Sequence, residues 1–69
     1  MSRKTVIEEY KAIFSDSSLT PEEQNSKAYQ KFCDEEKDFS PANQLSLLAQ
    51  IEKVADRNFD DIRLWIKLQ

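Results

Sequence analysis

The residues of this chain that could carry out chemistry are one thiol and several adjacent carboxylates. Cys33 is the single cysteine, and paired acidic residues stand at Glu8/Glu9, Glu22/Glu23 and Asp60/Asp61. An ionised thiol is a nucleophile, and two carboxylates with different pKa values can serve as general acid and general base. The sequence contains no histidine, so the Ser-His-Asp and Cys-His arrangements of nucleophilic catalysis cannot form.

Neither kind of group has the surroundings that catalysis needs. Acidic residues at 34–36 follow Cys33 directly, and their negative charges raise the pKa of a neighbouring thiol. Cys33 is therefore interpreted as a small buried hydrophobic residue. Adjacent residues of a helix diverge, so the paired carboxylates do not converge on one proton, and we interpret them as solvated side chains or helix-dipole partners. We expect no catalytic residues and a protein that is not an enzyme.

Ligands for a metal ion or a phosphate group are also scarce. Structural zinc sites usually combine four cysteine or histidine ligands, whereas this chain has one cysteine and no histidine. The acidic segment 34–38 lacks the spacing and the central glycine of an EF-hand calcium loop. A chain without glycine also lacks the phosphate-cradling loops of nucleotide sites. We expect no metal site, no cofactor and no small-molecule substrate.

Composition and charge indicate the setting in which the chain works. A single cysteine, without a signal-like apolar stretch at the N-terminus, favours a reducing, cytoplasmic compartment. No apolar run approaches the roughly 18 residues that a membrane-spanning helix needs, so we expect no membrane association. The formal net charge of −3 does not favour attraction to nucleic-acid phosphates, and it is too small for the carboxylate-rich surface of a DNA mimic.

Capping signals and apolar periodicity predict two helices in the first half of the chain. Thr5 opens a T-x-x-E box with Glu8, and one broad apolar face follows: Val6, Ile7, Tyr10, Ile13 and Phe14. After a turn, Thr20, Pro21 and Glu23 supply the N-cap, N1 and capping-box residues of a second helix. That helix is expected to end in the acidic segment 34–38. Its apolar side contains Ala28, Tyr29, Phe32 and Cys33.

The second half of the chain predicts a long helix and a short one. Ser40 and Pro41 repeat the cap-plus-proline signal, and a wide apolar stripe follows: Leu45, Leu47, Leu48, Ile51, Val54 and Ala55. We expect this helix to end near Arg57, with Asn58 as its left-handed cap. Either Asn58 or Asp60 can then cap the fourth helix.

These elements predict an all-α fold, a small compact bundle of three to four helices with a short C-terminal helix. The absence of glycine and the presence of two prolines fit helices that are joined by short polar turns. We expect residues 1–69 to form a single helical domain, with the large aromatic side chains in its core: Tyr10, Phe14, Tyr29, Phe32 and Phe39. A core of this size usually needs support from regular helix packing, a metal, disulfides or self-association.

The C-terminal segment 59–69 has more apolar surface than one face of a helix can bury. Helical spacing places one group of residues on a common face: Phe59, Ile62, Trp65 and Ile66. Leu64 and Leu68 fall on nearly the opposite face. Either this helix is wedged between two neighbours, or a second molecule covers the leucines.

The segment 41–69 also resembles the last two helices of a homeodomain. In both, a leucine-rich helix is followed by a turn and a final helix that contains a tryptophan, here within IRLWIK, and Phe32 matches the aromatic residue of the preceding helix. The resemblance covers about half of the chain and implies a helix-turn-helix DNA-binding module. The homeodomain pattern after the tryptophan is rich in arginine and includes an adenine-reading asparagine, whereas Lys67 is the one basic residue after Trp65 here. The turn before the last helix is also longer than in that motif.

We favour a protein partner or self-association over nucleic acid, with DNA binding as the alternative. The expected contact residues on the last helix are Leu64, Leu68, Trp65 and Arg63, because exposed apolar groups and tryptophan anchors mark interaction sites. A second expected contact is an acidic rim that includes Glu35 and Glu36 and could dock on a basic protein. Three cations could touch phosphates instead: Arg57, Arg63 and Lys67.

Overall fold

Four helices connected by short turns make up the described part of the chain. The computed structural model describes residues 3–69, with side chains described from Thr5 onward. The helices are α1 (Arg3–Phe14), α2 (Pro21–Glu35), α3 (Pro41–Ala55) and α4 (Asp60–Lys67), and no strand occurs among these residues. The prediction of an all-α bundle with a short C-terminal helix is confirmed. None of the described helices is both long and apolar enough to cross a membrane.

The beginnings of α2 and α3 follow their sequence signals, whereas the beginning of α1 does not. The Thr20 hydroxyl accepts a hydrogen bond from the Glu23 amide at 3.1 Å, and the Glu23 carboxylate accepts one from the Thr20 amide at 2.9 Å. The Ser40 hydroxyl accepts a 3.3 Å hydrogen bond from the Asn43 amide. Both helices have proline at N1 or N2, as predicted. Thr5 lies inside α1, which begins at Arg3, so the predicted T-x-x-E start is wrong.

The connection between α3 and α4 also differs from the prediction. Asp56, and not Asn58, adopts the left-handed conformation at the end of α3, with φ 54° and ψ 44°. Aspartate tolerates this region because its short polar side chain can bond locally. The N-cap of α4 is Phe59, which makes no side-chain cap, so neither Asn58 nor Asp60 has the predicted capping role. The Asp61 carboxylate instead accepts the Ile62 amide at 2.8 Å within the first turn.

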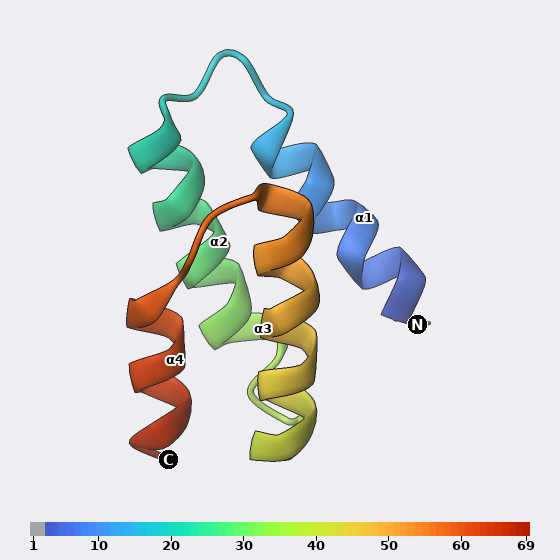
Figure 1. Cartoon of the computed structure of the whole chain (residues 1–69), viewed down its shortest axis with the longest axis vertical. Helices are drawn as coiled ribbons and strands as arrows, with labels where there is room; N and C mark the ends of the chain where they lie inside the picture. The colour runs from blue at the N-terminus through green and yellow to red at the C-terminus, as the bar shows by residue number, and fades with distance from the viewer. Residues whose placement is uncertain (1–2) are drawn as a thin grey trace.

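The helices form a bundle in which α1 and α4 each pack on both α2 and α3. Figure 1 shows α3 running antiparallel to α4, with α1 on the side of α3 that lies away from α4. The buried hydrophobic residues come from all four helices and from the N-cap position before α4: Val6, Tyr10, Ala28, Phe32, Leu47, Leu48, Ile51, Phe59, Ile62 and Ile66. Phe14 and Phe59 stack with their ring centroids 5.5 Å apart, which links the end of α1 to the start of α4.

Three residues that the sequence placed in the core lie at the surface instead. Leu45 and Val54 are about 40% exposed, and Phe39, in the turn before α3, is 38% exposed. Leu45 and Val54 are nine residues apart, which on an α-helix puts them on roughly opposite sides. The core-facing stripe of α3 is therefore narrower than its apolar pattern indicated, and it consists of Gln44, Leu47, Leu48 and Ile51.

Buried glutamines tie the turns to the helices. Gln44 is fully buried on α3, where its Nε2 donates to the Glu36 carbonyl at 2.9 Å and its Oε1 accepts from Gln69 Nε2 at 3.1 Å. Gln24 on α2 donates to the Asp16 carbonyl at 3.1 Å. Because burying an unpaired amide is costly, these bonds fix the α1–α2 and α2–α3 connections against the core.

Candidate protein-interaction surface

The outer face of α4 carries the two most exposed large hydrophobic residues of the described chain. Leu64 is 57% exposed and Leu68 is 77% exposed, whereas Ile62 and Ile66 on the same helix are buried. Leu64 and Leu68 are four residues apart and therefore form one stripe along the helix. The bundle buries one side of α4 and leaves the opposite apolar stripe uncovered.

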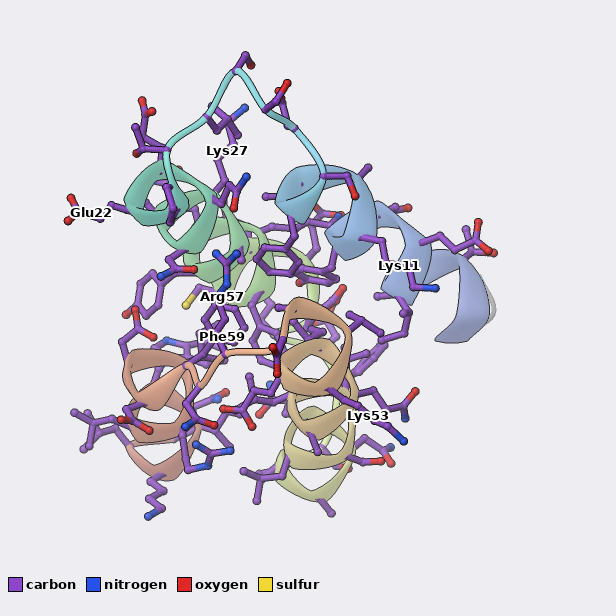
Figure 2. All side chains as sticks on the ribbon, turned by 45° about the horizontal axis from the view of Figure 1, so that its top comes forward. Lys11, Glu22, Lys27, Lys53, Arg57 and Phe59 are labelled. Atoms are coloured by element: carbon purple, nitrogen blue, oxygen red, sulfur yellow. The ribbon has the colours of Figure 1, made fainter. Side chains whose placement is uncertain are left out.

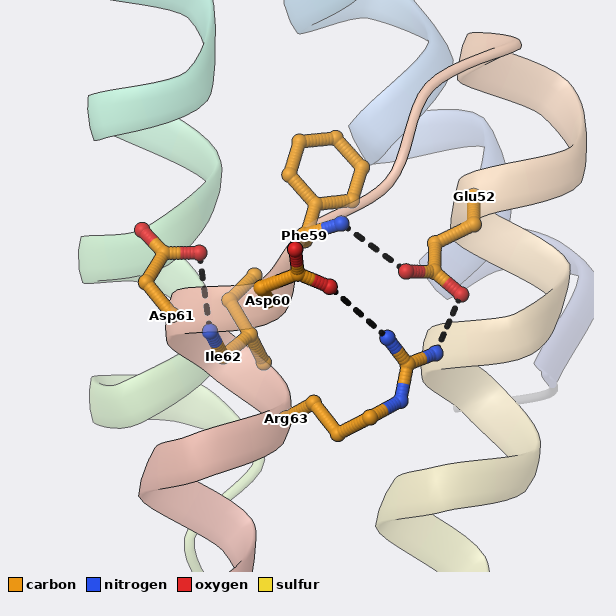
Figure 3. Close-up of polar contacts among 6 residues, drawn as sticks. All are labelled: Glu52, Phe59, Asp60, Asp61, Ile62 and Arg63. Atoms are coloured by element: carbon orange, nitrogen blue, oxygen red, sulfur yellow. Dashed lines mark hydrogen bonds and ion pairs between the residues drawn. The ribbon is translucent and has the colours of Figure 1, made fainter.

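α4 is held on the bundle by a polar clamp centred on Glu52 of α3 (Figure 3). One carboxylate oxygen of Glu52 accepts from Arg63 Nη2 at 2.6 Å, and the other accepts from the Phe59 amide at 2.8 Å. Partial burial alone would raise the pKa of Glu52, but the hydrogen bonds from Arg63 and Phe59 outweigh that effect and lower it. Arg63 also lies 3.5 Å from the Asp60 carboxylate. The clamp fixes the rotation of α4 and hence the direction in which Leu64 points.

Arg63 is therefore occupied within the chain, which differs from its expected role as a partner contact. Its guanidinium is bound to Glu52, and these hydrogen bonds raise its pKa further. About a third of the side chain is exposed to solvent, but its charge is already paired with that of Glu52. The sequence did not indicate Glu52 as the partner, because nothing in the local pattern marks a contact between two different helices.

Trp65 lies at the edge between α4 and α2. Its ring meets Phe32 edge-on, with the centroids 6.1 Å apart, and it is partly buried against the core. Tyr29 and Cys33 lie on the α2 side of this edge and are also partly buried, and both interact electrostatically with Asp61 at the start of α4. The indole thus continues the apolar surface from Leu68 towards α2 while it anchors α4.

The Cys33 thiol has the raised pKa that the sequence predicted, but for a different main reason. Burial raises the pKa first, a hydrogen bond with Tyr29 opposes it, and the charge of Asp34 adds a smaller increase. A thiol that is harder to ionise is a poor nucleophile. Among the described residues, no three His, Cys, Asp or Glu side chains are grouped as a metal site, and no pocket is present.

The acidic rim predicted on α2 is wrong at Glu36. Glu35 is exposed and pairs with Lys31 at 2.7 Å, and the same ammonium contacts Glu9 of α1 at 2.6 Å. Glu36 is 4% exposed, and its Oε2 atom is buried without a hydrogen-bond partner. As the C-cap of α2, Glu36 lies where the chain turns back towards α3, and its side chain is covered by the fold. Its carboxylate is not available to a partner.

Burial also perturbs the titration of Glu36 and Tyr10. Burial raises the pKa of Glu36, and the charges of Glu35 and Glu9 raise it further, while Lys31 lowers it. Burial likewise raises the pKa of Tyr10, with the charge of Glu36 as the next cause. The Tyr10 hydroxyl is buried without a hydrogen-bond partner, and Lys31 lies 5.3 Å from the centre of the Tyr10 ring. These groups form a polar cluster between α1 and the end of α2.

The cations that could have touched phosphates are mostly engaged inside the bundle. Arg57 extends from the α3–α4 connection towards α2 (Figure 2), where it donates to Gln24 at 3.2 Å and to Asn25 at 2.9 Å. Its guanidinium also lies 5.1 Å from the centre of the Phe14 ring. Arg63 is bound to Glu52, and Lys67 is exposed near the end of α4 beside the leucines.

Comparison with known proteins gives no family for this chain. No protein-family model, curated protein or solved structure matches it. The surfaces described above are therefore the basis for a functional proposal. Of these surfaces, the outer face of α4 has the most exposed of the large apolar side chains.

Proposed function

We propose that this chain is a non-enzymatic protein that acts by binding another protein through the outer face of α4. The observation that carries the proposal is the exposure of Leu64 and Leu68 on a helix whose opposite side is buried. Uncovered apolar side chains grouped on a rigid helix are typical of interaction sites. Trp65 beside them supplies the kind of aromatic anchor that dominates binding energy.

The Glu52 clamp supports the proposal because it makes the surface rigid before binding. A helix that is already fixed on its scaffold loses little conformational entropy when a partner docks. Arg63 serves the contact indirectly, by holding α4 through Glu52 at 2.6 Å. Glu35 remains at the surface and can steer a basic partner, whereas the buried Glu36 has no part in the contact.

A capture experiment with matched variants tests the proposal. Tagged wild-type chain and the double variant Leu64→Ser/Leu68→Ser are used as baits in extracts of the native cell, with Leu45→Ser/Val54→Ser on α3 as the control. The proposal expects a protein that is retained by wild type and by the α3 control but lost from the α4 variant. Circular dichroism must show that all three baits are folded. Equal capture by the α4 variant would refute the assignment of this face.

We also propose that the chain works in the cytoplasm. A single cysteine whose thiol is partly buried and hard to ionise suits a reducing compartment. Fractionation of the native cell with an antibody against the chain tests this, and recovery in a secreted or membrane fraction would contradict it.

A further inference from the structure

The outer face of α4 has two flanks of different chemistry on either side of Leu64. Successive residues of an α-helix are about 100° apart, so Asp60 and Lys67 lie about 40° and 60° to one side of Leu64. By the same spacing, Leu68 and Trp65 lie about 40° and 100° to the other side. The first flank carries Asp60 and Lys67 and faces the side of Glu52 and α3, while the second carries Leu68, Trp65 and the exposed Asp61 and faces the side of Phe32 and α2.

We propose that the partner of this face is a second copy of the chain, bound antiparallel through α4 with Leu64 at the centre. The inference rests on the proposed function, since it names the occupant of the same surface. A two-fold axis at Leu64 places the two Leu64 side chains opposite each other and sets residues before Leu64 opposite residues that follow it in the partner. It also places each flank against the same flank of the other copy. The flanks that carry Asp60 and Lys67 therefore face each other, and so do the flanks that carry Leu68 and Trp65.

The spacing on the charged flank makes the pairing complementary. With a rise of about 1.5 Å per residue, Asp60 lies about 6 Å before Leu64 and Lys67 about 4.5 Å after it. In the antiparallel pair, Asp60 therefore stands opposite Lys67 of the partner subunit, and the symmetry repeats this ion pair at the other end. The Asp60 side chain is 92% exposed despite its 3.5 Å contact with Arg63, and Lys67 is exposed as well. Both charges are therefore accessible to a second copy.

The second flank contributes apolar contact in the same register. Trp65 of one copy lies beside Trp65 of the partner subunit close to the axis, where the two Leu64 side chains also meet. Asp61 also lies on this flank, and the two-fold places it beside Leu68 of the partner subunit at each end of the contact. Its carboxylate keeps its hydrogen bond to the Ile62 amide of its own chain. An antiparallel register shifted to lie between Leu64 and Leu68 would still bury the leucines, but it would leave Asp60 beyond the last residue of the partner's helix. The charges therefore select the register centred on Leu64.

The size of α4 predicts a weak dimer. α4 has eight residues, and its length of about 12 Å limits the contact to less than the roughly 1,200 Å² of standard stable interfaces. Sedimentation velocity should therefore be run from about 10 µM to about 1 mM, where weak complexes become populated. We expect the weight-average sedimentation coefficient to rise with concentration, and to rise less at high salt because the ion pairs are exposed.

Charge reversal tests both the partner and the register. Asp60→Lys and Lys67→Asp each place like charges at both ends of the dimer, and each should raise the Kd about tenfold. An equimolar mixture of the two single variants restores opposite charges across the interface and should form heterodimers with near wild-type affinity. The double variant Asp60→Lys/Lys67→Asp should likewise dimerise as wild type does. Lys53→Asp, an exposed reversal on α3, is the control and should leave dimerisation unchanged.

The outcomes separate this inference from the proposed function. A chain that stays monomeric at about 1 mM refutes the second copy, while loss of a captured protein from the α4 variant would still support the binding face. Dimerisation that is insensitive to Leu64→Ser/Leu68→Ser refutes the dimer through α4, while the capture experiment alone decides whether another protein binds this face. Dimerisation that needs the leucines but shows no rescue in the mixed variants refutes the antiparallel register. Circular dichroism of each variant establishes that it is folded before any of these results is read.

Discussion

Glu52 of α3 binds Arg63 of α4 through a contact of 2.6 Å, and the pair joins two helices that the sequence separates by a sharp turn. The second oxygen of Glu52 accepts the Phe59 amide, which lies at the N-terminus of α4 and has no side-chain cap there. One carboxylate thus neutralises a guanidinium and satisfies a backbone donor that would otherwise be left without a partner. Through these bonds, the Glu52 side chain sets the position of α4 and of its exposed leucines.

Replacing Glu52 by alanine should destabilise the bundle by about 2 kcal/mol, because hydrogen bonds to a charged group are lost and two donors remain partly buried. Urea unfolding monitored by circular dichroism measures the change. Asp60→Ala is the matched control, since Asp60 is the weaker and more exposed partner of Arg63. We expect it to cost less than about 1 kcal/mol. Equal costs for the two variants would show that Glu52 is not the anchor of α4.

Acid should weaken the same clamp. The pKa of Glu52 is lower in the folded chain than its ordinary value, so its stabilisation is fully present above the ordinary carboxyl pKa. It is lost as the pH falls through the lowered value, where Arg63 loses its charged partner. Between neutral pH and pH 2, the free energy of unfolding of wild type should therefore fall more than that of Glu52→Ala. Parallel curves for the two proteins would contradict this assignment.

Glu36 should make the free energy of unfolding depend on pH with a sign opposite to that of Glu52. Its pKa is raised in the folded chain, so the folded state binds the proton more tightly than the unfolded state. Its favourable contribution is fully present below the ordinary carboxyl pKa and is lost as the pH rises through the raised value. Glu36→Gln, which cannot ionise, should therefore raise the thermal midpoint at pH 7 and flatten its dependence on pH in that range.

The exposed neighbour Glu35 is the control for Glu36. Glu35→Gln should change the midpoint at pH 7 little, because it removes one exposed ion pair with Lys31. A destabilised Glu36→Gln variant at pH 7 would show that the charge of Glu36 is stabilising, and would overturn the prediction.

The caps of α2 and α3 should differ in strength. Thr20→Ala removes a reciprocal pair of hydrogen bonds with Glu23, and we expect it to cost about 1 to 2 kcal/mol. Ser40→Ala removes a single bond of 3.3 Å, and we expect about 0.5 to 1 kcal/mol. Chemical denaturation of the two variants measures both losses of stability. A greater loss for Ser40→Ala than for Thr20→Ala would contradict the prediction.

Local signals predicted the helices well, and tertiary contacts explain why the burial of Glu36 and the pairing of Arg63 were missed. Thr20 and Pro21 act within a few residues of the helix that they begin, so the sequence alone revealed them. The burial of Glu36 depends on how the chain turns from α2 into α3, and no short pattern encodes that path. Arg63 was expected to contact another protein, because no local pattern shows that it pairs with Glu52 on a different helix of its own chain.

The same limit applied to the surface of α4. Helical spacing separated Leu64 from Ile62 and favoured Ile62 as the side that faces the bundle, but it could not show whether the bundle also covers Leu64. Both stripes of α4 would have been buried had the helix been wedged between two neighbours on opposite sides. The packing of α4 on α2 and α3 from one side settles the matter, since it leaves Leu64 57% exposed and Ile62 fully buried.

That difference predicts opposite effects for two substitutions that are two residues apart. Ile62→Ala should destabilise the bundle by about 2 to 5 kcal/mol, because it leaves a cavity among buried side chains. Leu64→Ala should change stability by less than about 0.5 kcal/mol, because it removes a side chain that is mostly in water. Urea unfolding at low protein concentration, where self-association is negligible, gives both values. A large loss for Leu64→Ala under these conditions would mean that Leu64 supports its own bundle, and the outer face of α4 would then no longer be free for a partner.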